Sequence, residues 1–355
     1  MNKRLGLHRS SRRVASGMSL VELMVAITIG ALIVATMSLL FANNSRSRSE
    51  TERSSQNIEN GRYALEVLRG ELHNAGYFGA FDSSRVALPA AKPDACATAL
   101  ADLRLSLGLH IQGYNDITAA TLGCLTDVKA GTDAFLVRRV SGTSCDLAGG
   151  ACGSLAGKPT FQASLCGKAT ETASADVSDH FRLDSDLANL DRHKRDCTTA
   201  PPGTLAEARR YVARVYYVAG NDRAGDGIPT LKYAELGTGG FSPTSLVQGV
   251  ENLQVEYGID ADGNGDAETY TADPDVGCAP ADCVARWSSV VAVKLFVLSR
   301  SVDQSPGHND TNTYVLGRKA DGTANSYTSL AAAYKRKVFQ EVVRLQNPAG
   351  RRGTN

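Results

Sequence analysis

The sequence predicts an α+β protein in which one long N-terminal helix packs on an antiparallel β-sheet head. Leu23–Ala42 is a run of twenty residues without a charge. The following segment 45–74 contains no proline, and its leucines recur at helical spacing. Strand-like segments come later in the chain, without the regular alternation of strands and helices that a parallel sheet requires.

The uncharged run is long enough to cross a membrane. Twenty residues at about 1.5 Å of rise span roughly 30 Å, the thickness of a bilayer core. Residues 1–17 contain no acid, and basic side chains near a membrane span stay in the cytoplasm. The head is therefore expected outside the cytoplasm. The basic residues are Lys3, Arg4, Arg9, Arg12 and Arg13.

The order of these features differs from that of a secretory signal, whose apolar segment is removed with the leader. Here the plausible cut, between Gly17 and Met18, lies before the apolar run. The mature chain would keep its hydrophobic end. Glu22 stands at the edge of that run, where a carboxylate costs about 2.5–3.5 kcal/mol and is rarely kept without a partner.

The run GMSLVELMVAITIGALIVA, at 17–35, resembles the class III leader junction of type IV pilins and pseudopilins. The resemblance implies that residues 1–17 are a leader, which a prepilin peptidase removes after Gly17. The same enzyme would methylate the new N-terminus, Met18. Glu22 would then pair with the methylated amine of a neighbouring subunit as a filament packs.

One continuous helix is expected from about Leu20 to about Ala75, with a length of roughly 80 Å. Its membrane-spanning part is 20–42, within a helical segment 18–76 that precedes a head of residues 77–355. The run ENGRYALEVLRGELHNAGYFG, at 59–79, resembles the PilW-type minor pilins and, more distantly, the J-type pseudopilin of type II secretion. GDGIPTL at 225–231 and LVQGVENLQVEYGID at 246–260 also resemble PilW features.

The head is predicted to contain strands separated by irregular stretches rich in small residues. The nearly unbroken apolar run 290–298 suits a central strand that is covered on both faces and meets the long helix. Segments 82–132 and 141–209 are interpreted as insertions, without assigned elements. The predicted strands are Ala134–Val140, Arg210–Ala219, Pro229–Leu236, Leu253–Ile259, Trp287–Ser299 and Arg336–Leu345.

All eight cysteines lie in the outward part, and an even number in an exported domain favours disulfides. Cys145 with Cys152, and Cys278 with Cys283, are close enough to staple loops. The other four, which allow three pairings, are Cys96, Cys124, Cys166 and Cys197. Zinc is the rival interpretation, but the sequence has no CxxC pair and no histidine at ligand spacing.

One loop contains alternating oxygen side chains, with glycine at its sixth position, as in the first half of a calcium loop. Its twelfth residue is Thr271 where an EF-hand has glutamate, and a strand precedes it, so a true EF-hand is not expected. Two interpretations stay open: a calcium site completed by other groups, such as Asp273 or Asp275, or a turn built by Asp, Asn and Gly. The candidate ligands are Asp260, Asp262, Asn264, Asp266 and Glu268.

Composition and motifs speak against two classes of function. Without the five leader cations the chain has 33 basic and 37 acidic residues, which predicts no nucleic-acid partner. No nucleophile elbow, phosphate loop or HExxH motif is present, so no catalytic residue is assigned. Four histidines, including His110, stand in contexts typical of surface loops, and Asp184 and Asp186 are interpreted as solvated loop charges.

The expected function is therefore that of a minor pilin, held in the inner membrane as a prepilin and later part of a pilus at the cell surface. The resemblance implies a subunit that helps to initiate assembly near the pilus tip, with the prepilin peptidase and other minor and major pilins as partners. Two alternatives stay open. One is a J-type pseudopilin of a secretion system, and the other is a membrane-anchored, calcium-stabilised adhesion or binding module that never enters a filament.

Overall fold

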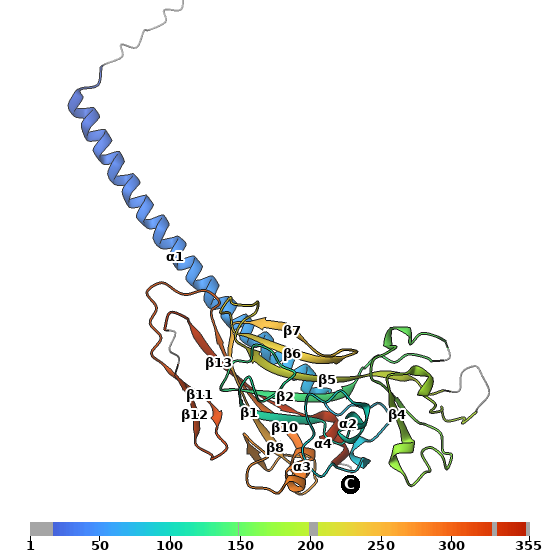
Figure 1. Cartoon of the computed structure of the whole chain (residues 1–355). Helices are drawn as coiled ribbons and strands as arrows, with labels where there is room; N and C mark the ends of the chain where they lie inside the picture. Colours follow the sequence, from blue (N-terminus) through green and yellow to red (C-terminus); the bar gives the residue numbers. More distant parts are fainter. Residues whose placement is uncertain (1–16, 148, 199–204, 329–331, 353–355) are drawn as a thin grey trace, which may run out of the picture. The chain divides into compact units, whose positions relative to one another are not determined.

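The computed structural model describes residues 17–147, 149–198, 205–328 and 332–352. The long helix α1 runs without interruption from Leu20 to His73 (Figure 1). Two compact units meet within this helix, one ending at Glu52 and the other beginning at Arg53. Gly76, at a φ of +70°, follows the helix end in the left-handed conformation that glycine adopts without strain. The expected long helix is confirmed.

The larger of the sheets in the second unit has seven strands, and all of its pairings are antiparallel. The order is β1-β2-β5-β3-β4, and β6 also pairs with β5 and carries β7 at the edge. The strands are β1 (Ile111–Ile117), β2 (Thr132–Val140), β3 (Thr160–Ala163), β4 (Phe181–Asp184), β5 (Ala208–Ala219), β6 (Thr230–Gly237) and β7 (Gly240–Gln248).

A second antiparallel sheet has the order β13-β10-β8-β9, and a separate hairpin pairs β11 with β12. β10 lies between two neighbours and most of its residues are buried, as predicted from its apolar run. The strands are β8 (Val250–Ile259), β9 (Thr269–Thr271), β10 (Val290–Arg300), β11 (Thr313–Arg318), β12 (Ala324–Thr328) and β13 (Arg336–Arg344).

The strand predicted from Trp287 begins later, at Val290. Residues 287 and 288 instead end helix α3, which starts with Pro280 at its first turn and buries Cys283, Val284 and Trp287 on one face. The other short helices are α2 (Leu100–Leu105) and α4 (Gln346–Arg352). Single turns of 3₁₀ helix occur at Ser83–Arg85, Gly153–Leu155, Val177–His180 and Leu187–Asn189.

The second half of α1 shares one hydrophobic core with both sheets. Leu65, Leu68 and Leu72 of the predicted stripe are buried in this core, whereas Ile58 is only half-buried. The remaining members come mainly from the inward faces of β2, β5, β8 and β10. Gly61 lets the helix approach β13 closely, because a Cβ atom there would lie 2.1 Å from the ring of Phe339.

Charged side chains join the same part of α1 to the seven-stranded sheet. Glu71 accepts hydrogen bonds from both Nε and Nη2 of Arg139 on β2, each at 3.1 Å, and it also pairs with Arg214 on β5. Arg214 in turn donates to Glu235 on β6 at 2.5 Å. These side chains are largely buried, so the ion pairs exclude much of the surrounding water.

All eight cysteines are paired in four disulfides. The two expected loop staples, Cys145–Cys152 and Cys278–Cys283, are confirmed. The pairing that the sequence left open is resolved as Cys96–Cys124 and Cys166–Cys197. Each of these two bridges closes a loop within one of the predicted insertions.

The two segments interpreted as insertions contain more regular structure than predicted. The first supplies β1, which pairs with β2 and extends the seven-stranded sheet. The second supplies β3 and β4, four residues each, in the lobe marked by β4 in Figure 1. Such short strands, paired across long sequence separations, leave no periodic pattern from which they could be predicted.

Several polar residues expected in surface loops are buried or bonded. His110 is buried against the carbonyl oxygen of Val290, which lies 2.6 Å from its Nε2. Burial lowers the pKa of His110 to about 4, although the bond to that carbonyl opposes the shift, so the ring is neutral near pH 7. Asp184 pairs with Arg104 at 3.4 Å, and Asp186 caps a 3₁₀ turn by accepting the Ala188 N–H. The surface prediction was wrong for His110 and for Asp184, which ends β4 and is half-buried, whereas Asp186 is exposed as predicted.

Because Leu68 is fully buried between α1 and the sheets, Leu68→Ala is expected to lower the free energy of unfolding by about 2–5 kcal/mol. Urea unfolding of a fragment that begins at Arg53 measures this value. Leu105→Ala is the matched control, since Leu105 is 55% exposed and its truncation should change stability by less than about 0.5 kcal/mol. Equal effects of the two changes would contradict the proposed core.

Candidate functional site

The residues expected to be processed lie directly before α1. Residues 1–16 of the expected leader fall outside the described residues, so the structure begins at Gly17, one residue before the predicted new N-terminus. Met18 is 65% exposed, and no atom beyond its chain neighbours lies within 4 Å of a Cβ placed on Gly17. Both residues on which a peptidase would act are thus accessible.

Ser19 and Glu22 form a capping box at the start of α1. The Ser19 N–H donates to Oε2 of Glu22 at 3.1 Å, and the Val21 N–H donates to Oγ of Ser19 at 3.4 Å. The two side chains thereby satisfy N–H groups that have no partner within the helix. Glu22 turns its carboxylate back toward Met18, where the resemblance places the new amine.

The first half of α1 is apolar around its whole circumference. Its most apolar window has a mean hydropathy of 2.4, and none of this window is buried, so α1 is long and apolar enough to cross a membrane. Its polar side chains need no water: the hydroxyl groups of Thr28, Thr36 and Ser38 each donate to a carbonyl oxygen three or four residues earlier. This surface suits lipid or other apolar helices.

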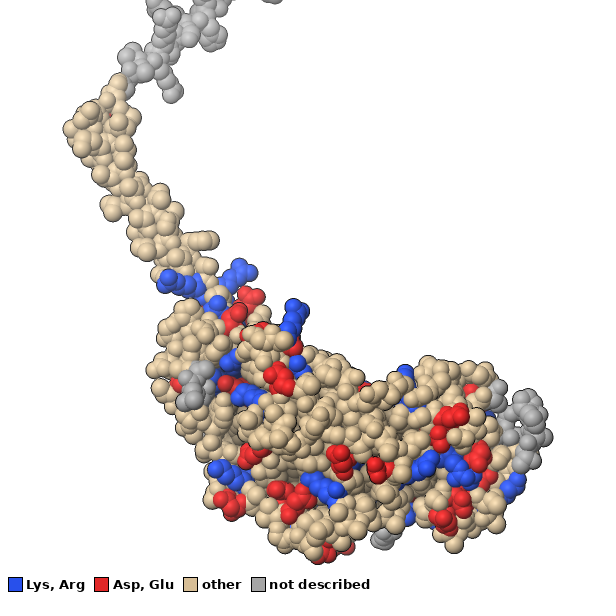
Figure 2. All heavy atoms as spheres, viewed as in Figure 1, with Lys and Arg blue, Asp and Glu red and all other residues tan. Residues whose placement is uncertain are grey.

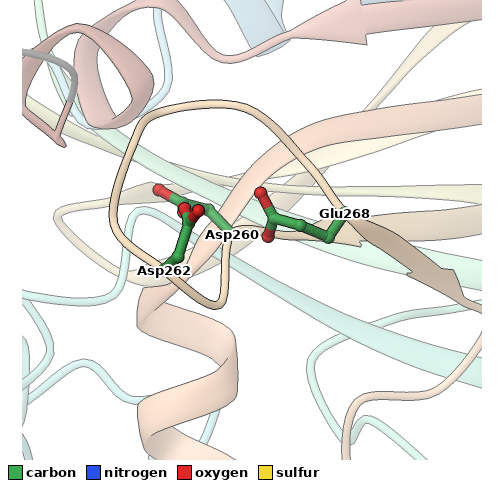
Figure 3. Close-up of side chains that lie close together, drawn as sticks. All are labelled: Asp260, Asp262 and Glu268. Carbon is green, nitrogen blue, oxygen red and sulfur yellow. The ribbon is translucent and has the colours of Figure 1, made fainter.

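The structure brings together three of the five candidate calcium ligands. Asp260, Asp262 and Glu268 each offer a carboxylate oxygen within 4.8 Å of the others, and their side chains converge inside the loop (Figure 3). Asp266 lies outside this group of carboxylates, because its side chain is 79% exposed and pairs with Arg344 at 3.4 Å. The amide of Asn264 donates to Asp262 at 3.0 Å, so Asn264 contacts the group through its nitrogen.

The same carboxylates also hold the loop in its turns. The two oxygens of Asp260 accept the N–H groups of Gly263 and Gly265 at 2.7 and 3.0 Å. Glu268 accepts the Ala261 N–H at 2.7 Å. Arg352 lies 3.5 Å from Asp260, where its positive charge opposes a nearby cation. These bonds support the turn interpretation, and calcium binding stays a prediction.

A second acidic loop, at 221–227, also forms turns through its own side chains. Asp226 accepts the N–H groups of Asp222, Arg223 and Ile228, and Asn221 accepts that of Gly227. These bonds close the loop on its own backbone, as Asp and Asn side chains do in tight turns.

Sequence reasoning missed Glu71, which ties the helix to the head. It was placed in a helix that packs on the head, but its partners Arg139 and Arg214 follow 68 and 143 residues later. No local spacing indicates such pairs. On the visible face of the head, basic and acidic side chains intermingle (Figure 2).

Two family models match the chain. One, described as "Type IV Pilus-assembly protein W", matches residues 215–347, and the other, the prokaryotic N-terminal methylation motif, matches residues 12–38. Among solved structures, the type IV-like pilin TTHA1219 from Thermus thermophilus resembles the chain with 9% identity and a TM-score of 0.33. That alignment covers 82% of this chain and 96% of the other. A search among curated proteins found no match.

The calcium hypothesis predicts that calcium raises the melting temperature of the wild-type head relative to chelator. At a hundredfold excess over Kd the stabilisation would be about 2.7 kcal/mol. Asp262→Ala should abolish the increase, because Asp262 lies in the carboxylate group. Asp266→Ala is the control and should retain it, since Asp266 lies outside. A wild-type melting curve that is the same with calcium and with chelator would leave these residues a purely structural role.

Proposed function

This chain is a type IV pilus-assembly protein of the PilW type with an N-terminal methylation motif, and we propose that it is a minor pilin that helps to start the pilus and remains near its tip. A pilus-assembly protein of this kind is a structural subunit and not an enzyme. The methylation motif implies processing by a prepilin peptidase, and the family implies other pilins as partners.

The single observation that carries the proposal is the division of α1 into two chemically different halves. The first half exposes apolar side chains on all sides and begins with the Ser19–Glu22 capping box. In the second half, the leucines on one face lie in the core of the head, and Glu71 belongs to an ion-pair network. A helix of this design can leave lipid for a bundle of similar helices while its head stays folded.

Glu22 has a separate role in this proposal. After cleavage the amine of Met18 carries a positive charge, and in an apolar bundle a carboxylate without a partner is costly. The amine of an adjacent subunit supplies that partner. The pairing fixes the axial register of one helix against the next, because only one offset brings the two charges together.

A J-type pseudopilin would share the helix chemistry, and the match to a pilus-assembly family over 215–347 favours the pilus. A membrane-anchored adhesion module would keep its leader. We expect the intact mass of the protein from its native membrane to lack residues 1–17 and to include one methyl group on Met18. A mass that retains the basic leader would contradict processing and would support the anchored module.

Glu22→Ala is expected to leave membrane insertion intact and to reduce incorporation into pili at least about tenfold, because the amine of the neighbouring subunit then lacks its partner. Quantification of the protein in sheared pili against that in membranes measures this ratio. Glu52→Ala is the matched control, since Glu52 is an exposed acid on the same helix and its loss should leave incorporation unchanged. Equal incorporation of the Glu22 variant and the wild type would refute the assembly role.

A further inference from the structure

β13 is an open edge of the four-stranded sheet. It pairs with β10 over nine consecutive residues, from Arg336 with Arg300 to Arg344 with Ala292, without a register shift. Within the described ranges no strand pairs with its other side. A row of backbone groups therefore faces outward along a straight, regular strand.

The hydrogen bonds at the two ends of β13 show which of its backbone groups face outward. Just beyond the ends of β13, the Leu345 N–H donates to the carbonyl of Val291, and the Lys335 carbonyl accepts the Ser301 N–H. Residues of an antiparallel strand point their backbone groups alternately toward and away from the partner. The odd-numbered residues of β13 thus face β10. The even-numbered residues, including Val338, Gln340 and Val342, direct their N–H and C=O groups outward.

The other edges are short or interrupted. β7 contains Pro243, which has no N–H to donate. β9 has three residues and β4 has four, and the pairing of β1 is irregular between Tyr114 and Ile117. Proteins shorten or interrupt exposed edges because such edges recruit other strands. β13 has nine residues, no proline and no bulge, so it is the edge best suited to accept another strand.

The side chains along this edge indicate what it would accept. Val342 is 58% exposed on the sheet face away from α1, and Val315 of the neighbouring hairpin is 55% exposed. Exposed basic residues, Lys337 and Arg344, lie toward the two ends of the strand. An incoming strand that complements the edge has apolar residues in its middle and acidic residues near its ends.

We propose that the β13 edge receives a strand of this kind from the head of another pilin, which continues the four-stranded sheet across the subunit boundary. The inference rests on the proposed function, since a filament built by helix packing brings heads side by side. Glu341 of β13 pairs with Arg69 of α1 at 3.5 Å, so the edge lies beside the helix that packs in the filament. Main-chain hydrogen bonds supply the contact and the flanking side chains select the partner.

Amide hydrogen exchange tests the edge directly. The probe is the full-length protein in detergent, alone and after co-expression with the other pilin subunits of its own system. Alone, the N–H groups of Val338, Gln340 and Val342 should exchange rapidly, while those of Phe339 and Glu341 are protected. In the complex, exchange of the outward set should slow by at least about tenfold. Outward amides already protected in the dilute protein, or unchanged in the complex, would overturn the proposal.

Gln340→Pro removes one outward N–H and places a ring on the edge, while its carbonyl and the bonds to β10 remain. It should reduce the co-purified partner subunits at least about tenfold, and Gln340→Ala, which keeps the N–H, should not. Val342→Lys, which leaves the backbone unchanged, should weaken the complex in the same direction. Undiminished complexes from both Gln340→Pro and Val342→Lys would overturn the proposal.

Three further outcomes distinguish an error in the occupant, in the edge and in the proposed function. Protection that appears in the protein alone as its concentration rises would identify a second copy as the occupant and overturn the assignment to another pilin. A complex that forms normally with unprotected edge amides would refute the edge while the minor-pilin function stands. If Glu22→Ala enters pili like the wild type and the native protein retains its leader, the proposed function itself fails.

Discussion

The structure depends on one constraint: a single unbroken helix must suit an apolar environment along its first half and a folded head along its second. The transition occurs near Glu52, where the apolar surface has ended and the leucine stripe begins. A break in the helix there would separate the apolar first half from the second half that packs on the head. Helical sequence without proline or glycine from 45 to 60 keeps the backbone continuous, and the buried Asn57 bonds to Ser299 of β10 at 2.5 Å, which fixes the helix on the sheet from its first buried position onward.

The ion pairs of Glu71 complement this packing. Leucine contacts have no fixed direction and allow a helix to slide, whereas the two-point contact between Glu71 and Arg139 fits only one position. The network is largely buried, so removal of one partner leaves a charge without compensation. Any force carried along the helix into the head passes through this region, and the directional bonds resist sliding where apolar contacts do not.

The sequence predicted the structure where the determining pattern lies within one segment of the chain. The hydrophobic run, the leucine stripe and the β10 core strand are periodic or compositional features, and each was placed within a few residues. The sequence failed where contacts join distant segments. The four-residue strand β3, the burial of His110 and the two open disulfide pairings all depend on which segments meet in space. The acidic loop lies between these cases, because its spacing indicated either turns or a calcium site but could not show which carboxylates converge.

The distribution of these features along the chain separates assembly from specialisation. The PilW match spans β10 and the open edge of β13, which are among the elements that contact the second half of α1. The lobe that is stapled by Cys166–Cys197 lies before it. The disulfide adds to the stability that the lobe gains from Phe161, Phe181 and Leu183, which pack in a core with residues of β2 and β5. The lobe lies outside the matched residues, so contacts particular to this subunit are to be sought there.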